Sequence, residues 1–375
     1  MGDASSTRLS SLVLAMTTLV GGAAAGGPPP APEHRWTAAI TDSHQAVQAM
    51  MKRSGTPGVG VAVSIDGEIV WQEGFGYSNL EHMTPVIPDT KFGIGSISKS
   101  LTTALVGRLM DERLVDLDAP VEKYLPDFPH SGRRISIRLI ASHLSGIDDR
   151  TERELYYTAR HFDSTREAVE LLWSDPVVHE PRSREQYATG TYTIIAAVVE
   201  SVTGQSFLTA MKTHVFDPLG LSSTVPNQRR RIVSHRTAFY ERNDEGTIVH
   251  APYFDPSFKW AGAGFLSTAE DLVRFGQAMM RPGFLSERTW KEITTPQRTT
   301  NGQLVSALGW DVSRDDQGRE FIAKSGGGPG IRGYLAIFPE HDLVVAILSN
   351  RSRAPVIEEV FPTFVNAFLR DCCLL

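Results

Sequence analysis

Cysteine is almost absent from this chain of 375 residues. Its only two cysteines, Cys372 and Cys373, stand within the last four positions. A disulfide framework therefore cannot hold the body of the protein together, and a cysteine-rich metal site cannot form. A hydrophobic fraction of 41% supplies enough apolar residues for a proper core. The composition predicts a globular protein that is stabilised by packing.

An excess of positive charge and a long hydrophobic run are also missing. The net charge of −6 and the pI near 6.0 give no electrostatic reason to expect nucleic acid or an anionic membrane as a partner. Apolar residues 9–20 are too few and too diluted by Ser and Thr to span a membrane, but with the small residues 21–25 they are typical of a signal peptide. We expect a signal or targeting segment at 1–25 and a Gly/Pro-rich linker at 26–35. Secretion or export to a periplasm follows, with a mitochondrial presequence as the alternative.

The remaining residues 36–375 carry alternating helix and strand patterns. Hydrophobic periodicity and turn residues predict the following elements: a helix at 36–53, a hairpin of strands 59–65 and 68–72, a helix at 98–113, strands at 333–339 and 343–348, and a helix at 356–369. Strands thus lie toward both ends of the chain, with helical patterns and Pro-containing loops between them. We expect an α/β (α+β) protein whose α/β part combines 36–95 with 235–375, and whose helical part is 96–234.

Lysine is scarce, which makes one short motif informative. Only eight of the 37 basic residues are lysines, and Lys99 alone has a serine three positions before it. On a helix, Ser96 and Lys99 share one face, so the amine can reach the hydroxyl. A serine becomes a good nucleophile only when a base takes its proton. Lysine can act as that base if burial or nearby positive charge lowers its pKa.

Two further strings follow in the chain, Tyr187-Ala188-Thr189 and Lys324-Ser325-Gly326-Gly327. A phenol close to two ammonium groups has a lowered pKa and can relay a proton between serine and leaving group. The glycine-rich string predicts an edge strand whose main chain lies along the substrate. The backbone amides of Gly327 and Ser96 then form an oxyanion hole.

Other catalytic motifs fail on their context. The Gly-x-Ser-x-Gly elbow is absent around Ser96, and no His-Glu-x-x-His occurs among the 11 histidines. Residues 328–333 match Gly-x-Gly-x-x-Gly, but a strand pattern follows where a dinucleotide site needs a helix. His143 could serve as the base of a Ser-His-Asp triad, yet we interpret it as a structural histidine in a turn, because Lys99 is already placed as the base. We therefore expect neither a metal nor a cofactor.

These strings resemble the serine β-lactamase-like superfamily, which includes class C β-lactamases, D-alanyl-D-alanine carboxypeptidases and related esterases. The resemblance runs from about residue 37 to 370 and rests on 95–102, 142–147 and 259–268. It implies a β-lactamase/transpeptidase-like fold, with an antiparallel sheet flanked by helices and an inserted helical domain. It also implies these roles: Ser96 as acylated nucleophile, Lys99 as its base, Tyr187 as proton shuttle, Thr189 as a contact to the acyl side, and Lys324 with Ser325 as the charged and polar groups facing the substrate.

The branch that the chain resembles most is the mitochondrial β-lactamase-like proteins of animals. Those proteins have His where this chain has Lys324 and carry a long insertion that is missing here, and the β-lactamases have Asn where this chain has Thr189. The expected activity is a serine hydrolase that cleaves an amide or ester through an acyl-enzyme, as a peptidase or esterase. A β-lactamase or acyltransferase using the same site, or a non-catalytic penicillin-recognising scaffold, is the alternative. We expect a small-molecule or peptide substrate, and homo-oligomerisation stays open.

Overall fold

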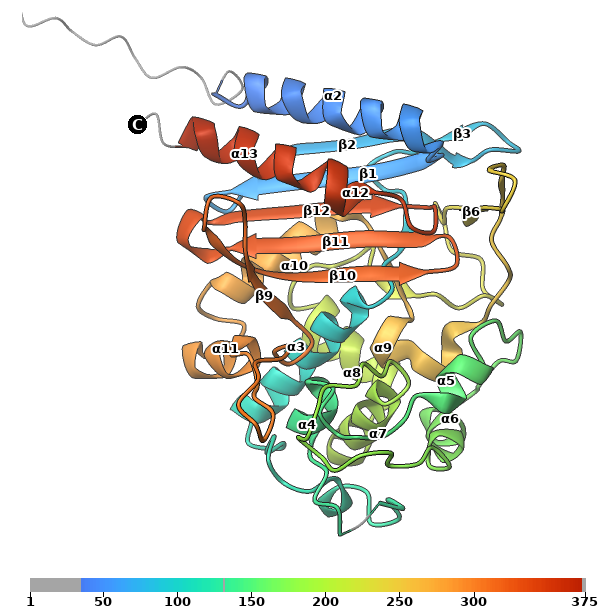
Figure 1. Ribbon diagram of the computed structural model, residues 1–375, viewed down its shortest axis with the longest axis vertical. Helices are drawn as coiled ribbons and strands as arrows, with labels where there is room; N and C mark the ends of the chain where they lie inside the picture. Colours follow the sequence, from blue (N-terminus) through green and yellow to red (C-terminus); the bar gives the residue numbers. More distant parts are fainter. Residues whose placement is uncertain (1–34, 131, 373–375) are drawn as a thin grey trace, which may run out of the picture.

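A computed structural model describes residues 35–130 and 132–372 (Figure 1). The expected targeting segment and residues 26–34 of the expected linker lie outside the described residues. Within them, no single helix is long and apolar enough to cross a membrane. Two consecutive helical segments, 192–203 and 207–216, are long and apolar enough for a membrane span only when they are counted together, and they are bent by 80° relative to each other.

The largest sheet has seven antiparallel strands in the order β3-β2-β1-β12-β11-β10-β9. Their bounds are β1 Gly58–Ile65, β2 Glu68–Asn79, β3 Thr84–Pro85, β9 Asp311–Arg314, β10 Glu320–Gly328, β11 Ile331–Phe338 and β12 Leu343–Ser349. Strands from the two ends of the described chain therefore meet where β1 pairs with β12. The antiparallel sheet flanked by helices confirms the expected fold class, whereas the division into parts at residues 95 and 235 stays a prediction.

The β1–β2 hairpin turns where the sequence predicts it. Asp66 and Gly67 both have positive φ values, 52° and 83°, as a two-residue turn that follows the right-handed twist of the strands requires. Side chains on β1 then alternate between the two faces of the sheet. Val61 and Val63 belong to the hydrophobic cluster between the sheet and the helices near the two ends of the described chain. Ala62 belongs to a second hydrophobic cluster on the opposite face of the sheet.

Helices cover both faces of this sheet (Figure 1). Helix α2 (Thr37–Ser54), α12 (Val356–Glu359) and α13 (Phe361–Cys372) lie on one face, and α10 (Ala269–Met280) lies on the other. The prediction of one continuous closing helix at 356–369 is wrong in one respect, because the helix breaks at Val360. Pro362 lacks a backbone N–H and fits only the first turn of a helix, so a new helix begins there.

The middle of the chain forms the helical layer beside α10. Its main helices are α3 (Ile97–Asp111) and α7 (Tyr192–Thr203), and α3 runs between the sheet and the other helices (Figure 1). The shorter elements are α4 Ile137–Ala141, α5 Arg150–Glu154, α6 Thr165–Leu172, α8 Phe207–Met211, α9 Trp260–Ala263, α11 Glu287–Thr294, β4 Phe92–Gly93, β5 Val225–Pro226, β6 Tyr240–Arg242, β7 Ile248–His250 and β8 Phe265–Ser267. Helix α3 is buried around most of its circumference, because it packs against β10 of the sheet as well as against α9 and α11.

Candidate active site

Ser96 and Lys99 meet at the start of α3. Ser96 is the N-cap residue of this helix, and Lys99 follows one turn later on the same face. The Lys99 Nζ atom lies 3.1 Å from Ser96 Oγ, and the lysine side chain is fully buried. The helical spacing thus gives the proximity that the sequence motif predicts.

Two further oxygen atoms contact the Lys99 amine. Thr189 Oγ1 lies 3.1 Å from Nζ, and the main-chain oxygen of Gly262 lies 2.9 Å from it. A neutral amine has two N–H donors and one lone pair. As an ammonium group, Lys99 donates to all three oxygens, and after it has lost a proton it can still donate to Gly262 and Thr189 while its lone pair accepts the hydroxyl proton of Ser96. These contacts fit a lysine that acts as a base.

Electrostatics favour that neutral form. Burial lowers the pKa of Lys99, and the positive charge of Lys324 lowers it further, while Tyr187 and Asp149 oppose this shift. The first cause is the largest, because an ammonium group removed from water loses its hydration. The net result is a lysine pKa below its usual range.

Tyr187 approaches the nucleophile from the other side. Its hydroxyl donates to Ser96 Oγ over 2.9 Å, while 49% of the residue surface remains exposed. The amines of Lys99 and Lys324 lie 4.9 and 5.5 Å from the centre of its ring. Burial of the hydroxyl pushes the pKa of Tyr187 upward, but the two lysines outweigh it and the net pKa is lowered. The phenol therefore has both expected lysine side chains as neighbours.

The loop that carries Tyr187 is held through its backbone amides. His143 Nδ1 accepts a hydrogen bond from the amide of Ala188 over 3.2 Å, and Asp149 accepts from the amides of Thr189 and Gly190 over 2.7 and 2.9 Å. The His143 ring also lies against the Tyr187 ring, with 4.1 Å between their centroids.

His143 does not contact the nucleophile in this arrangement. Its Nδ1 atom bonds the loop, and Ser96 Oγ is bonded by Lys99 and Tyr187 instead. Burial, followed by the charges of Lys99 and Lys324, holds the pKa of His143 well below its usual range. The neutral ring can therefore keep Nδ1 as an acceptor. This geometry matches the interpretation of His143 as a structural residue.

Lys324 lies on β10 with 3% of its side chain exposed. Its Nζ atom is 3.2 Å from Asp311 Oδ2, an ion pair that the motifs did not predict. Strand β10 itself is not the edge strand that we expected, because β9 lies outside it in the sheet order. The pairing with β9 stops at Ala323, however, so the half from Lys324 to Gly328 pairs with β11 alone. The main chain there remains open on one side.

Close backbone packing joins this strand to the start of α3. Gly95 has a φ of 50°, and a Cβ atom at this position would lie 2.6 Å from the nitrogen of Gly327. A Cβ on Gly326 would overlap the carbonyl of Ile94. Only glycines permit this approach. It brings Gly327 next to the residue that precedes Ser96, as an oxyanion hole built from the amides of Ser96 and Gly327 needs.

A cavity of about 550 Å³ opens above these groups. Six of the seven residues expected from the sequence line it: Ser96, Tyr187, Thr189, Lys324, Ser325 and Gly327. Lys99, the seventh, lies buried beside Ser96. Phe254 and Ile331 add an apolar part to the wall, and Asp149, Glu152 and Lys259 add a charged part.

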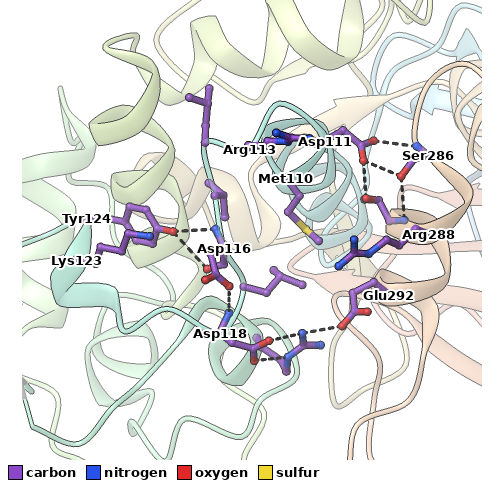
Figure 2. A pocket seen from close by; sticks show the side chains of 15 residues that line it. Met110, Asp111, Arg113, Asp116, Asp118, Lys123, Tyr124, Ser286, Arg288 and Glu292 are labelled. Carbon is purple, nitrogen blue, oxygen red and sulfur yellow. Dashed lines mark hydrogen bonds and ion pairs between the residues drawn. The ribbon is translucent and has the colours of Figure 1, made fainter.

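Size alone does not identify this cavity as the site. Figure 2 shows another cavity, of about 680 Å³, whose wall holds a serine, Ser286, that is bonded to a carboxylate and not to a lysine. There Asp111 bonds Ser286, and Arg138 bridges Asp118 and Glu292. These groups are bonded to one another, which makes this cavity a weaker candidate for the active site than the cavity at Ser96. Across residues 35–130 and 132–372, no group of three or more His, Cys, Asp or Glu side chains is placed to hold a metal ion.

Three residues that contact Lys99, Lys324 or the loop of Tyr187 were not predicted from the sequence. Gly262 contributes a main-chain carbonyl, which carries no sequence signature even though 259–268 was recognised as a family string. Asp149 lies two residues after the family string 142–147, and Asp311 begins the short polar strand β9. Both are single carboxylates without a motif of their own.

Comparison with known proteins places this geometry in a family. The sequence matches the beta-lactamase family over residues 44–361. It is 30% identical to the serine beta-lactamase-like protein LACTB, mitochondrial, of Bos taurus, over 86% of this chain and 76% of that protein. It is 26% identical to a D-aminopeptidase of Gluconobacter oxydans, over 83% of this chain and 59% of that protein.

Solved structures share the fold. The octameric penicillin-binding protein homologue from Pyrococcus abyssi superposes with a TM-score of 0.76 at 23% identity, over 88% of this chain and 77% of that one. The resemblance inferred from the motifs, including that to the animal mitochondrial proteins, is thus confirmed. The family match spans most of the sequence, and the chain belongs to the beta-lactamase family.

Proposed function

We propose that this chain is a serine hydrolase that cleaves an amide or ester bond through a covalent intermediate on Ser96. The observation that carries the proposal is the position of Ser96 Oγ, 3.1 Å from the Lys99 amine and 2.9 Å from the Tyr187 hydroxyl. A nucleophile needs a base within hydrogen-bond reach, and a leaving group needs an acid. Both requirements are met at one serine that lines a cavity.

In the first half of the reaction, Lys99 takes the proton of Ser96 and Oγ attacks the substrate carbonyl. The amides of Ser96 and Gly327 stabilise the negative oxygen that forms. Tyr187 gives its proton to the leaving nitrogen or oxygen as the scissile bond breaks, and recovers a proton from Lys99. The products of this half are a free amine or alcohol and an ester on Ser96.

In the second half, water attacks that ester. Its proton passes to Lys99, which is neutral again once Tyr187 has recovered its own proton, and Ser96 Oγ leaves with a proton. The chain then holds a free Ser96 and releases a carboxylic acid. No metal or redox cofactor enters this balance.

For the substrate we propose an amide or ester with an apolar group next to the scissile carbonyl. Phe254 and Ile331 supply an apolar wall, and Lys324 supplies a buried positive charge. The D-aminopeptidase relative supports a peptidase-type or amidase-type reaction. A β-lactamase or acyltransferase would use the same acyl-enzyme, and differs only in the substrate or in the acceptor that replaces water.

The decisive experiment is to incubate the full chain with a fluorophosphonate and to locate the adduct by mass spectrometry. The reagent loses fluoride to the attacking serine, so we expect one adduct, on Ser96, and none in Ser96→Ala. An unlabelled wild type, or equal labelling of Ser96→Ala, would contradict the proposed hydrolase activity at Ser96 and favour a non-catalytic scaffold. A panel of p-nitrophenyl esters, D-amino-acid amides and nitrocefin then separates esterase, peptidase and β-lactamase activities.

We also propose a targeting segment and a homo-oligomeric state. Residues 1–25 act as a targeting segment, in line with the mitochondrial relative, and N-terminal sequencing of the mature protein tests for cleavage near Ala25. The chain also forms a homo-oligomer, in line with the octameric homologue, and light scattering on purified protein measures its mass. A monomer mass, or an uncut N-terminus, would contradict the respective proposal.

A further inference from the structure

Asp149 lies at the N-cap position of α5, but it does not cap that helix. Its side chain makes no hydrogen bond to the amides of α5, which is the usual task of an aspartate at this position. The carboxylate turns to another segment and accepts from the amides of Thr189 and Gly190 over 2.7 and 2.9 Å. Only 7% of the residue is exposed. A buried carboxylate is costly, so its use on a loop 40 residues away calls for an explanation.

The loop held by Asp149 carries two hydroxyl groups of the candidate active site. Tyr187 contacts Ser96 Oγ, and Thr189 Oγ1 contacts the Lys99 amine. The fit between carboxylate and loop is tight, because a Cβ atom on Gly190 would lie 2.8 Å from Asp149 Oδ1. A small displacement of Asp149 would therefore move both hydroxyl groups.

A buried ion pair fixes the helix from which Asp149 projects. Glu152, one turn further along α5, is bonded to Lys259, and the two residues are 8% and 4% exposed. Lys259 immediately precedes α9, which contains Gly262, and the carbonyl of Gly262 contacts Lys99. The loop that carries Thr189 and the segment that carries Gly262 both contact the Lys99 amine, and both are thus bonded to carboxylates of α5 or its N-cap.

We propose that Asp149 is a positioning residue of the active site, which sets the Thr189 hydroxyl against Lys99 and the Tyr187 hydroxyl against Ser96 through the backbone of their loop. This inference rests on the proposed function, because it assigns a role in acylation of Ser96. Asp149 acts through other residues and supplies no proton to the substrate.

The charge of Asp149 adds an effect that a neutral tether would not have. Glu152 and Arg153 on α5, Lys99 on α3 and the two loop amides all face its carboxylate. Burial, with the neighbouring Glu152, raises the pKa of Asp149 to about 6, so the carboxylate is ionised above that pH. Its negative charge raises the pKa of Lys99, against the lowering by burial. Removal of the charge should therefore make Lys99 a weaker base with a lower pKa.

The experiment compares Asp149→Asn with Asp271→Asn in the full chain. Asp271 is a matched control, because it is also buried and accepts from the amide of Ser223 and the hydroxyl of Thr224, but it does not line the cavity. The rate of fluorophosphonate labelling of Ser96 is measured against pH and scaled to the folded fraction from circular dichroism.

We expect Asp149→Asn to lower the plateau rate by about 10- to 100-fold, because misplaced catalytic groups have effects of this size. We also expect the acid limb of its pH profile, where the rate falls as Lys99 becomes protonated, to move to lower pH. Asp271→Asn should keep both the wild-type plateau and the wild-type limb. A role that is only structural would leave the limb in place and reduce only the folded fraction.

A double-mutant cycle with Thr189→Val completes the test. If Asp149 acts through Thr189, the combined variant should lose clearly less than the product of the two single losses, while Thr189→Ser should restore most of the rate. Independent losses, or a wild-type profile for Asp149→Asn, would overturn the positioning role and leave the serine hydrolase standing. A wild-type chain that is not labelled at Ser96 would overturn both.

Discussion

The ammonium group of Lys324 lies 3.2 Å from the carboxylate of Asp311, and the two side chains differ sharply in exposure. Lys324 is 3% exposed and Asp311 is 46% exposed. The cation is thus fixed in the cavity wall, while its partner can turn toward solvent. An anionic group of a substrate can compete with Asp311 for the same lysine, at little cost in desolvation of the aspartate.

Neutralising this partner should strengthen the field at Ser96. In Asp311→Asn the charge of Lys324 is no longer balanced, and that charge lowers the pKa of both Lys99 and Tyr187. We expect the acid limb of the acylation profile to move to lower pH. In Lys324→Met it should move to higher pH, with a loss of roughly tenfold in rate, or about 1.4 kcal/mol. Stopped-flow labelling between pH 5 and 10 measures both, and shifts in the same direction would contradict the field argument.

Lys99 should be the group that defines this acid limb. Below its pKa the amine is protonated and cannot accept the proton of Ser96, so the rate should fall as the pH falls through the pKa of Lys99. Lys99→Met should reduce acylation by about 10²- to 10⁴-fold. Lys99→Arg should do the same, because a guanidinium stays protonated. Lys291→Met removes a charge from the exposed face of α11 and should leave the rate unchanged. Equal losses in Lys291→Met would point to net charge and not to a base.

Tyr187→Phe should separate amides from activated esters. The variant keeps the ring that packs on His143 and loses the hydroxyl that contacts Ser96. An amine leaves only after protonation, whereas p-nitrophenolate leaves without it. We expect hydrolysis of D-amino-acid amides to fall by about 10²-fold or more and that of p-nitrophenyl esters to fall much less. Measurement of kcat/KM on both substrates decides the matter. Equal losses would mean that Tyr187 positions Ser96 and does not donate the proton.

The local part of the candidate site could be predicted from sequence. Ser96 and Lys99 are three residues apart on a helix, so their contact follows from helical geometry alone. The hairpin at Asp66 and Gly67 follows in the same way from turn chemistry. Tyr187 required the family resemblance, because no spacing rule connects it with a serine 91 residues earlier.

The rest depends on packing between distant segments. Gly262 contacts Lys99 through a carbonyl, a group that every residue carries, so no side chain announces it. Strand β9 has four residues and little apolar character, which hid the true edge of the sheet. Asp149 looks like an ordinary N-cap residue until the structure shows that its carboxylate serves another segment.

The buried pair of Glu152 and Lys259 should stabilise the fold only as a pair. Glu152→Gln leaves the ammonium of Lys259 buried without its counter-ion, beside the ring of Tyr156. We expect a loss of about 3–5 kcal/mol in the free energy of unfolding. Replacement of both residues by Met removes the unpaired charge as well, and should recover most of that loss. Glu320→Gln is the control, because it breaks an exposed pair with Arg314 and should cost less than about 1 kcal/mol. Urea unfolding followed by circular dichroism measures all three variants. If the double variant is no more stable than Glu152→Gln, the loss of stability comes from lost packing and not from an unpaired charge. The ion pair would then not hold α5 against α9, as the positioning of Asp149 requires.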